Sequence, residues 1–198
     1  MVTSARCLAD VGTDHGYIPI YLVEEGIVSS AIAMDINKGP LQRASENIER
    51  HGLSGRIGTR LSDGLKALAP GEADCVVIAG MGGGLVKKIL TEGREALESV
   101  RELILQPQSE LEEVRRFLWE QGYVTEAEEM VLEDGKYYPM MRLRPPYAAG
   151  ETEGGPGRDG KTKRRDLAGN CEEAKSREAA VNCDCLLYTS PVYQWNPF

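Results

Sequence analysis

Four apolar runs in the first part of the 198-residue chain each lead into a segment that is rich in glycine or acidic residues. The segments are residues 10–16 (DVGTDHG), Asp35, residues 62–64 (SDG) and residues 79–84 (AGMGGG). Glycines let a backbone turn sharply and approach a ligand closely. A carboxylate can accept hydrogen bonds from both hydroxyls of a ribose, and a short polar side chain can accept one from the exocyclic amine of adenine. Together the four segments favour binding of a nucleoside.

Each segment also has an explanation that needs no ligand. The first can be a plain strand-to-helix turn, Asp35 a helix N-cap, residues 62–64 a turn, and residues 79–84 a flexible loop. Two other nucleotide motifs are excluded. Gly12 and Gly16 have the spacing G-x-x-x-G rather than the G-x-G-x-x-G of dinucleotide dehydrogenases, and the sequence contains no G-x-x-x-x-G-K-[ST] string of a P-loop.

The elements that must position these segments alternate between strands and helices. Apolar runs predict strands over residues 6–11, 31–35, 56–61, 74–79 and 102–106. Helical patterns cover residues 17–26, 40–51 and 84–91, and a capping pattern at Ser109 opens another helix. Asp134-Gly135 between two strand-like runs predicts a hairpin. We therefore expect an α/β fold of the Rossmann-like, class I S-adenosylmethionine-dependent methyltransferase type, with a mostly parallel sheet and a C-terminal antiparallel hairpin.

Composition divides the chain into two parts. The 23 Lys and Arg residues against 31 Asp and Glu give a formal net charge of −8, which argues weakly against a nucleic-acid partner held by bulk charge alone. Large apolar residues are frequent before Tyr147 but rare between Ala148 and Asp184. We therefore expect a folded domain over residues 1–147 and a tail without a core over residues 148–198. No apolar run is long enough to span a membrane, and no secretory signal is evident.

Five strings of the sequence resemble the TrmK family, which comprises bacterial tRNA (adenine-N1)-methyltransferases that modify adenine 22. The strings are LADVGTDHGYIPIYLV, AIAMDINKGPLQRASENIERHGL, TRLSDGL, VVIAGMGGGLV and LILQP. They follow one another in order from about Arg6 to Arg144. The resemblance implies a Rossmann-like methyltransferase fold, S-adenosyl-L-methionine as the methyl donor, and tRNA as the substrate.

The same resemblance assigns residues to the cofactor. Residues 10–15 would surround its methionine part, Asp35 and Ile36 its ribose and adenine, and residues 63 and 64 its adenine. The expected cofactor-binding residues are Asp10, Gly12, Thr13, Asp35, Ile36, Asp63, Gly64, Ala79, Gly80, Met81 and Gly82. Residues 79–82 stand where many adenine-N methyltransferases carry an Asn/Asp-Pro-Pro-aromatic motif. The sequence therefore does not reveal which residue clamps the target base.

Asp14 and His15 are the candidate catalytic residues. The lone pair on adenine N1 can attack a sulfonium methyl group without a strong base, so positioning supplies most of the effect. The methylated product is cationic, and the Asp14 carboxylate could stabilise that charge. His15 could contact the base or the cofactor. The alternatives are that Asp14 caps the following helix and that His15 is a plain loop residue.

Other candidate residues favour structural roles. Cys7 and Cys75 lie in predicted strands and indicate core packing. Cys171, Cys183 and Cys185 lack a second metal-binding pair, so we expect neither zinc nor any other metal. The cysteine pattern fits a reducing cytoplasm, and we expect a monomer. The pairs Lys87-Lys88 and Arg115-Arg116 are typical of solvated helix faces.

Two departures from the family concern the ends of the chain. The family has a helix before the first strand, which is missing here, and a coiled-coil region after the last strand, where this chain has no heptad pattern. Residues 185–191 (CLLYTSP) resemble a translated sequencing adaptor, so we expect residues 148–198 to be out of frame, with a genuine disordered extension as the alternative. The rival functions are a small-molecule methyltransferase and an inactive cofactor-binding fragment.

Overall fold

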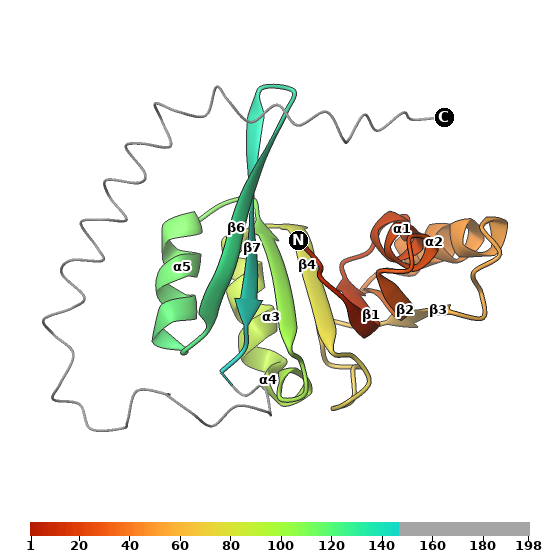
Figure 1. Cartoon of the computed structure of the whole chain (residues 1–198), viewed down its shortest axis with the longest axis horizontal. Coiled ribbons are helices and arrows are strands. Elements are labelled where there is room, and N and C mark those ends of the chain that lie inside the picture. Colours follow the sequence, from red (N-terminus) through yellow and green to blue (C-terminus); the bar gives the residue numbers. More distant parts are fainter. Residues whose placement is uncertain (147–198) are drawn as a thin grey trace, which may run out of the picture. The chain divides into compact units, whose positions relative to one another are not determined.

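A computed structural model describes residues 1–146 of the chain, which lie within a compact unit, Met1–Glu151 (Figure 1). The expectation for residues 148–198 lies outside the described residues. The strands are β1 (Ala5–Val11), β2 (Val28–Asp35), β3 (Ile57–Leu61), β4 (Cys75–Met81), β5 (Glu102–Pro107), β6 (Val124–Glu133) and β7 (Lys136–Arg144). The helices are α1 (Tyr17–Glu24), α2 (Lys38–Arg50), α3 (Gly83–Glu92), α4 (Arg94–Leu97) and α5 (Leu111–Glu120).

The described strands form one seven-stranded sheet in the order β3-β2-β1-β4-β5-β7-β6. Strands β1 to β5 are parallel, whereas β7 pairs antiparallel with both β5 and β6. This confirms the predicted fold class. The order reverses between β1 and β4, which is the switch point where open α/β sheets bind ligands.

Two apolar cores lie on opposite faces of the sheet. Along β4, Val76 and Ile78 belong to the core that contains residues of α3 and α5, while Cys75 and Val77 belong to the core that contains residues of α1 and α2. This alternation is the period-2 pattern of a strand buried on both faces. Cys75 is buried, as predicted, and burial raises the pKa of its thiol. Cys7 is only half-buried, so the prediction that it packs in the core is wrong; it lies near the exposed start of β1.

The helices differ from the sequence prediction in several places, and α1 ends at Glu24 rather than at residue 26. Helix α2 begins at Lys38 rather than at Pro40, because a proline in the first turn lacks only an N–H that has no helical partner. The short helix α4 was not predicted. Ser109 does not cap α5, whose N-cap residue is Glu110 without a side-chain cap hydrogen bond. The Ser109 hydroxyl instead accepts a hydrogen bond from Gly83 N at 3.3 Å, a tertiary contact.

The hairpin between β6 and β7 forms as predicted. Asp134 and Gly135 both have positive φ, 49° and 76°, which matches the turn that Asp-Gly favours in two-residue hairpins. Strand β6 is at the edge of the sheet and is exposed along nearly its whole length. Within residues 1–146, no helix is long and apolar enough to cross a membrane.

Candidate active site

The segments that follow the parallel strands meet at one edge of the sheet. Gly12 N and Thr13 N donate hydrogen bonds to Met34 O at 2.8 and 2.9 Å, which joins the loop after β1 to the end of β2. Ser62 N donates to Asp35 O at 2.8 Å and joins the end of β3 to that of β2. Parallel register accounts for this gathering, because Val11 of β1 lies beside both Met34 and Ile78.

Glycine is required in the loop after β1 by conformation and by space. Gly12 and Gly16 have φ values of 83° and 72°, which side chains rarely adopt. A Cβ on Gly12 would lie 2.1 Å from Met81 Cε, so Met81 from the end of β4 contacts the loop after β1. A Cβ on Gly16 would lie 3.3 Å from Ala44 Cβ on α2. The loop is therefore enclosed by neighbouring elements.

Asp10 places a buried carboxyl group at the base of this loop. Its side chain is 5% exposed, and burial raises its pKa to about 6. The nearby Thr13 hydroxyl lowers this pKa in part, and the Asp35 charge raises it further. Thr13 Oγ1 is itself buried and has no hydrogen-bond partner of good geometry among the described residues. A buried carboxyl beside an unsatisfied hydroxyl is a site that a polar or cationic ligand would complete.

Asp14 and His15 lie on the exposed side of the same loop. The Asp14 carboxylate accepts a hydrogen bond from Arg43 of α2 and lies 3.3 Å from His15 Nε2. The Arg43 hydrogen bond is the main reason that the pKa of Asp14 is lowered. Asn47 Nδ2 donates to His15 O at 2.9 Å, and the His15 ring stacks on that of Tyr17, with centroids 5.1 Å apart.

The helix that follows does not use Asp14 as a cap. The N-cap residue of α1 is Gly16, and no side chain makes a cap hydrogen bond there. The structural alternative for Asp14 is therefore wrong, and its carboxylate is held by α2 instead.

Asp35 ends β2 and is half-buried. Its Oδ1 accepts a hydrogen bond from Asn37 N at 2.6 Å. The N-cap residue of α2 is Asn37, not Asp35, so the cap alternative for Asp35 is also wrong. Ile36, which follows, is 60% exposed at the same edge. An exposed apolar side chain beside a carboxylate suits a ligand with one flat apolar part and one polyol part.

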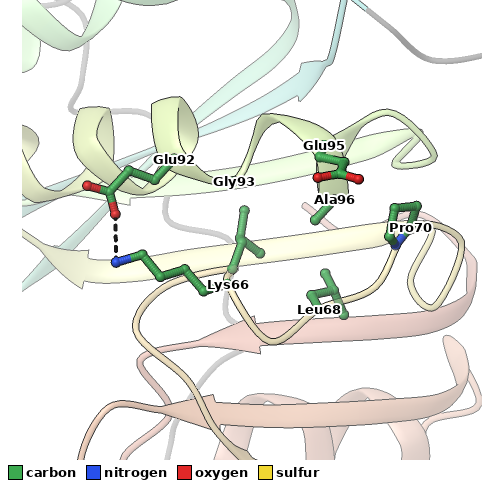
Figure 2. A pocket seen from close by; sticks show the side chains of 8 residues that line it. Lys66, Leu68, Pro70, Glu92, Gly93, Glu95 and Ala96 are labelled. Carbon is green, nitrogen blue, oxygen red and sulfur yellow. Dashed lines mark ion pairs between the residues drawn. The ribbon is translucent and has the colours of Figure 1, made fainter.

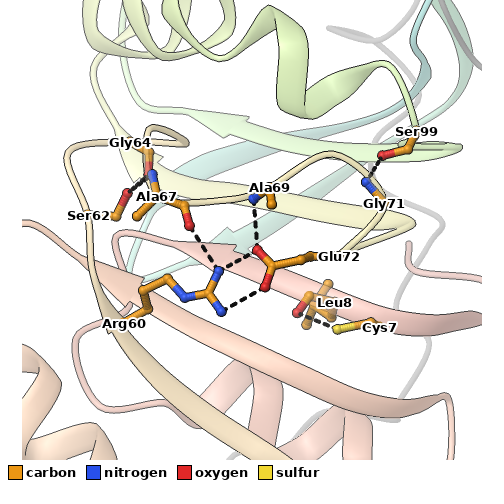
Figure 3. Close-up of polar contacts among 10 residues, drawn as sticks. All are labelled: Cys7, Leu8, Arg60, Ser62, Gly64, Ala67, Ala69, Gly71, Glu72 and Ser99. Atoms are coloured by element: carbon orange, nitrogen blue, oxygen red, sulfur yellow. Dashed lines mark hydrogen bonds and ion pairs between the residues drawn. The ribbon is translucent and has the colours of Figure 1, made fainter.

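Residues 62–64 form a tight turn after β3 (Figure 3). Ser62 Oγ donates to Gly64 O at 2.7 Å, and Gly64 has a φ of 60°. Asp63 forms an ion pair with Lys66, which lowers the pKa of Asp63. Lys66 in turn pairs with Glu92 of α3 at 3.0 Å (Figure 2). Residues 62–64 therefore form the turn that would explain them without a ligand. The Asp63 side chain is nevertheless partly exposed, so this turn does not exclude a binding role.

The segment after β4 is held from the end of β5. Gly80 N donates to Gln106 Oε1 at 2.9 Å, and Gly80 has a φ of 75°. Ala79 and Met81 are half-buried, and Gly82 is the N-cap residue of α3. Sequence reasoning did not identify Gln106. Its signal was a polar residue at the end of the apolar run 102–106, which is unusual for a strand buried on both faces.

Two hollows of the described surface lie outside these loops. One, of about 250 Å³, lies between the segment after residue 64 and the ends of α3 and α4 (Figure 2). The other, of about 400 Å³, includes Arg6, Asp74 and Arg101 at the amino ends of their strands. Within the part of the chain that the structure describes, no group of three or more His, Cys, Asp or Glu residues could hold a metal ion.

The parallel sheet, its antiparallel hairpin and the loops at the carboxyl edge define a methyltransferase domain. The family described as "Methyltransferase domain" matches residues 1–141. The chain is 39% identical over 140 residues to the tRNA (adenine(22)-N(1))-methyltransferase of Bacillus subtilis (strain 168), covering 71% of this chain and 59% of that protein. The chain thus spans about three-fifths of the length of this relative.

Solved structures show the same relationship. The B. subtilis m1A22 tRNA methyltransferase TrmK superposes with a TM-score of 0.69 and 38% identity, covering 73% of this chain and 61% of that one. Streptococcus pneumoniae Sp1610, a putative tRNA (m1A22) methyltransferase solved in complex with S-adenosyl-L-methionine, gives a TM-score of 0.71 and 35% identity, covering 92% of this chain and 87% of that one. The chain belongs to the TrmK family.

Proposed function

We propose that this chain is the catalytic domain of an enzyme that transfers a methyl group from S-adenosyl-L-methionine to N1 of adenine 22 in tRNA. The observation that carries the proposal is the 39% identity, over 140 residues, to the B. subtilis enzyme of that name. The matched region includes every loop at the carboxyl edge of the sheet. We further propose that residues 1–147 form this domain and that it acts as a monomer in the bacterial cytoplasm.

The residues at the carboxyl edge fit the proposed cofactor. S-adenosyl-L-methionine carries an ammonium, a sulfonium, a carboxylate, a ribose and an adenine, and when bound it supplies an electrophilic methyl group. The buried Asp10 suits the cationic part, and the Thr13 hydroxyl lacks the partner that a polar group would provide. Gly12 supplies the positive φ that the tight turn needs, and Asp35 suits the ribose hydroxyls. Residues 63 and 64, with residues 79–82, would complete the binding site.

The raised pKa of Asp10 predicts that cofactor binding depends on pH. A bound cation beside Asp10 would favour the ionised carboxylate, so binding would release a proton near pH 6. The affinity for S-adenosylhomocysteine, which retains the ammonium group, should therefore increase from pH 5 to pH 7 in titration calorimetry. In an Asp10→Asn variant the affinity should be lower and this pH dependence should be lost.

Asp14 and His15 would act on the target base. Arg43 keeps Asp14 ionised, and a carboxylate near the base would stabilise the positive charge that develops on the methylated adenine. The His15 ring stacks on Tyr17, and the His15 backbone carbonyl accepts a hydrogen bond from Asn47. These restraints support a role for the ring in contacting the base or the cofactor. Neither residue needs to remove a proton from N1, which has a free lone pair.

The test is N1-methyladenosine formation on unmodified tRNA by the full chain and by a version extended to the length of the relatives. Asp14→Asn and His15→Ala should each reduce turnover by about 10- to 100-fold with cofactor affinity retained. Glu46→Gln, on the exposed face of α2, is the matched control and should leave turnover unchanged. Turnover near the parent level in both loop variants would remove Asp14 and His15 from the catalytic roles.

A second candidate function follows from the length of the chain. Because it spans about three-fifths of the B. subtilis relative, the chain could bind the cofactor without acting on tRNA. In that case S-adenosylmethionine would raise the melting temperature of the full chain, while methylated tRNA would appear only with the extended version.

A further inference from the structure

We propose that Arg60 and Glu72 form a positioning pair that fixes the turn at residues 62–64 for the adenine of the cofactor. This inference rests on the proposed function, because it concerns how strongly and how selectively the domain binds its cofactor. Neither side chain is among the residues expected to touch the cofactor. Their effect would pass through the backbone that lies between them.

The pair joins β3 to the segment that leads into β4. Arg60 Nη1 lies 2.5 Å from Glu72 Oε2, and Arg60 Nη2 lies 2.9 Å from Glu72 Oε1, so the guanidinium meets both carboxylate oxygens (Figure 3). Such two-bond pairs fix direction as well as distance. Each side chain is about one-third exposed, which protects the pair from solvent in part. The charge on Glu72 is favoured as well, since the Arg60 hydrogen bond lowers the pKa of Glu72.

Both side chains also bind the backbone of the intervening segment. Arg60 Nη1 donates to Ala67 O at 2.9 Å, and Glu72 Oε2 accepts a hydrogen bond from Ala69 N at 2.8 Å. Ala67 N donates to Ser62 Oγ at 3.1 Å, and Ser62 Oγ donates to Gly64 O. A continuous series of hydrogen bonds thus runs from Glu72 to the turn that carries Asp63 (Figure 3).

A second contact also restrains this turn, through the side chain of Asp63. Asp63 pairs with Lys66, and that pair is exposed to solvent, so salt screens it. The side chains of the Arg60–Glu72 pair are less exposed, so salt should screen this pair less. Loss of the pair would leave the strand in place, since β3 is held by its ladder to β2, but would loosen residues 62–64.

The experiment measures dissociation constants of two probes by titration calorimetry on the full chain. The probes are S-adenosylhomocysteine and its inosine counterpart, in which an oxygen replaces the adenine amine. In Glu72→Gln, the affinity for S-adenosylhomocysteine should fall about tenfold, whereas the affinity for the inosine probe should fall much less. The preference for adenine should therefore shrink. Arg60→Lys, which keeps the charge but cannot form the two-bond contact, should behave in the same way.

Glu128→Gln is the matched control, because Glu128 forms a comparable pair with Arg115 at 2.8 Å on an element outside the carboxyl edge. It should leave both dissociation constants unchanged. Unchanged selectivity in both Glu72→Gln and Arg60→Lys, or an equal loss for both probes, would overturn the positioning role. If the parent chain binds neither probe, the proposed cofactor function itself fails, and that result is distinct from unchanged selectivity in a parent that binds.

Discussion

The loops after β1 and β4 are both rich in glycine, yet individual glycines in them are required for different reasons. In the loop after β1, Gly12 and Gly16 adopt backbone angles that side chains disfavour. At the start of α3, Gly83 has no such angle, but a Cβ there would lie 2.5 Å from Ser109 O and 2.8 Å from Val114 Cγ2. Gly16 is therefore required mainly for its backbone angle, and Gly83 for the close approach of two chain segments. Gly80 also has a positive φ, and Gly12 combines a positive φ with a lack of space beside Met81.

The contacts that hold the two loops differ as well. Arg43 and Asn47, one turn apart on α2, hold Asp14 and His15 from the outside, and the Arg43 contact is exposed. The loop after β4 is held by Gln106, which is 9% exposed. Salt screens exposed charges but has little effect on a buried hydrogen bond between uncharged groups. The two loops should therefore respond differently to salt and to substitution.

The largest expected contrast concerns the buried groups at the base of each loop, the acid Asp10 and the neutral amide Gln106. Unfolded Asp10 ionises from its ordinary pKa of 3.8, but folded Asp10 ionises only at about 6. The folded state therefore binds more protons between these values, and Asp10 lowers stability progressively as the pH rises from 4 to 6. Relative to the parent, the free energy of unfolding of Asp10→Asn should rise by about 2.4 kcal/mol between pH 4 and pH 7.

Denaturant unfolding of both proteins across that pH range measures the difference. Other carboxylates cancel in the comparison, since both proteins contain them. Gln106→Glu is a useful counterpart, because it should introduce a similar fall in stability with rising pH beneath the second loop. A stability difference between Asp10→Asn and the parent that is independent of pH would contradict the burial argument.

The next prediction tests whether Gly83, at the start of α3, is required because a side chain has no room there. Gly83→Ala should lower the free energy of unfolding by about 2 kcal/mol, because backbone atoms would have to move to admit the new methyl group. Gly84→Ala is the matched control: its Cβ would lie 3.5 Å from Glu110 Oε1, an ordinary contact. That variant should be neutral or slightly more stable, since alanine favours helix more than glycine does. If the two variants were equally stable, lack of space at Gly83 could not be the reason for its glycine.

A smaller effect is expected from the turn after β1. Gly16→Ala and Gly26→Ala both place a side chain at positive φ, 72° and 68°, which should cost each about 1 kcal/mol. Gly26 has no neighbour within 4 Å, whereas Gly16 faces Ala44 on α2. Thermal unfolding should show the larger loss in Gly16→Ala, and cofactor affinity should fall only in that variant. An affinity loss in Gly26→Ala would show a general weakening of the fold instead.

The smallest effect is that of the Arg43–Asp14 ion pair. Arg43→Gln should lower stability by about 0.5 kcal/mol at low salt and by almost nothing at 1 M salt, because the pair is exposed. Arg56→Gln, at an exposed position outside α2, is the control for a general charge effect. A salt-independent loss would mean that Arg43 holds the loop by a contact that salt does not screen, as the hydrogen bond of the buried Gln106 does for the loop after β4.

Local patterns predicted the strands and the segments at their carboxyl ends, because apolar runs and glycines leave a signal within a few residues. The contacts that fix those segments left no such signal. Arg43 reaches Asp14 across 29 residues, and Arg60 reaches Glu72 across 12. Arg43 and Asp14 become neighbours only when β1, α1, β2 and α2 have packed, and Arg60 meets Glu72 only when the segment between β3 and β4 has folded back. Ser109 shows the reverse case, in which a sound capping pattern lost to a tertiary contact with Gly83.

The exposed edge strand β6 has a consequence for how the chain associates. It carries Glu126, Glu128, Glu129 and Glu133, and in the described residues only its inner side is paired, with β7. An open edge is a template on which another strand can add, and charged side chains along that edge oppose the addition. Sheet growth between newly synthesised copies is thereby discouraged at a stage when the domain is most prone to aggregate.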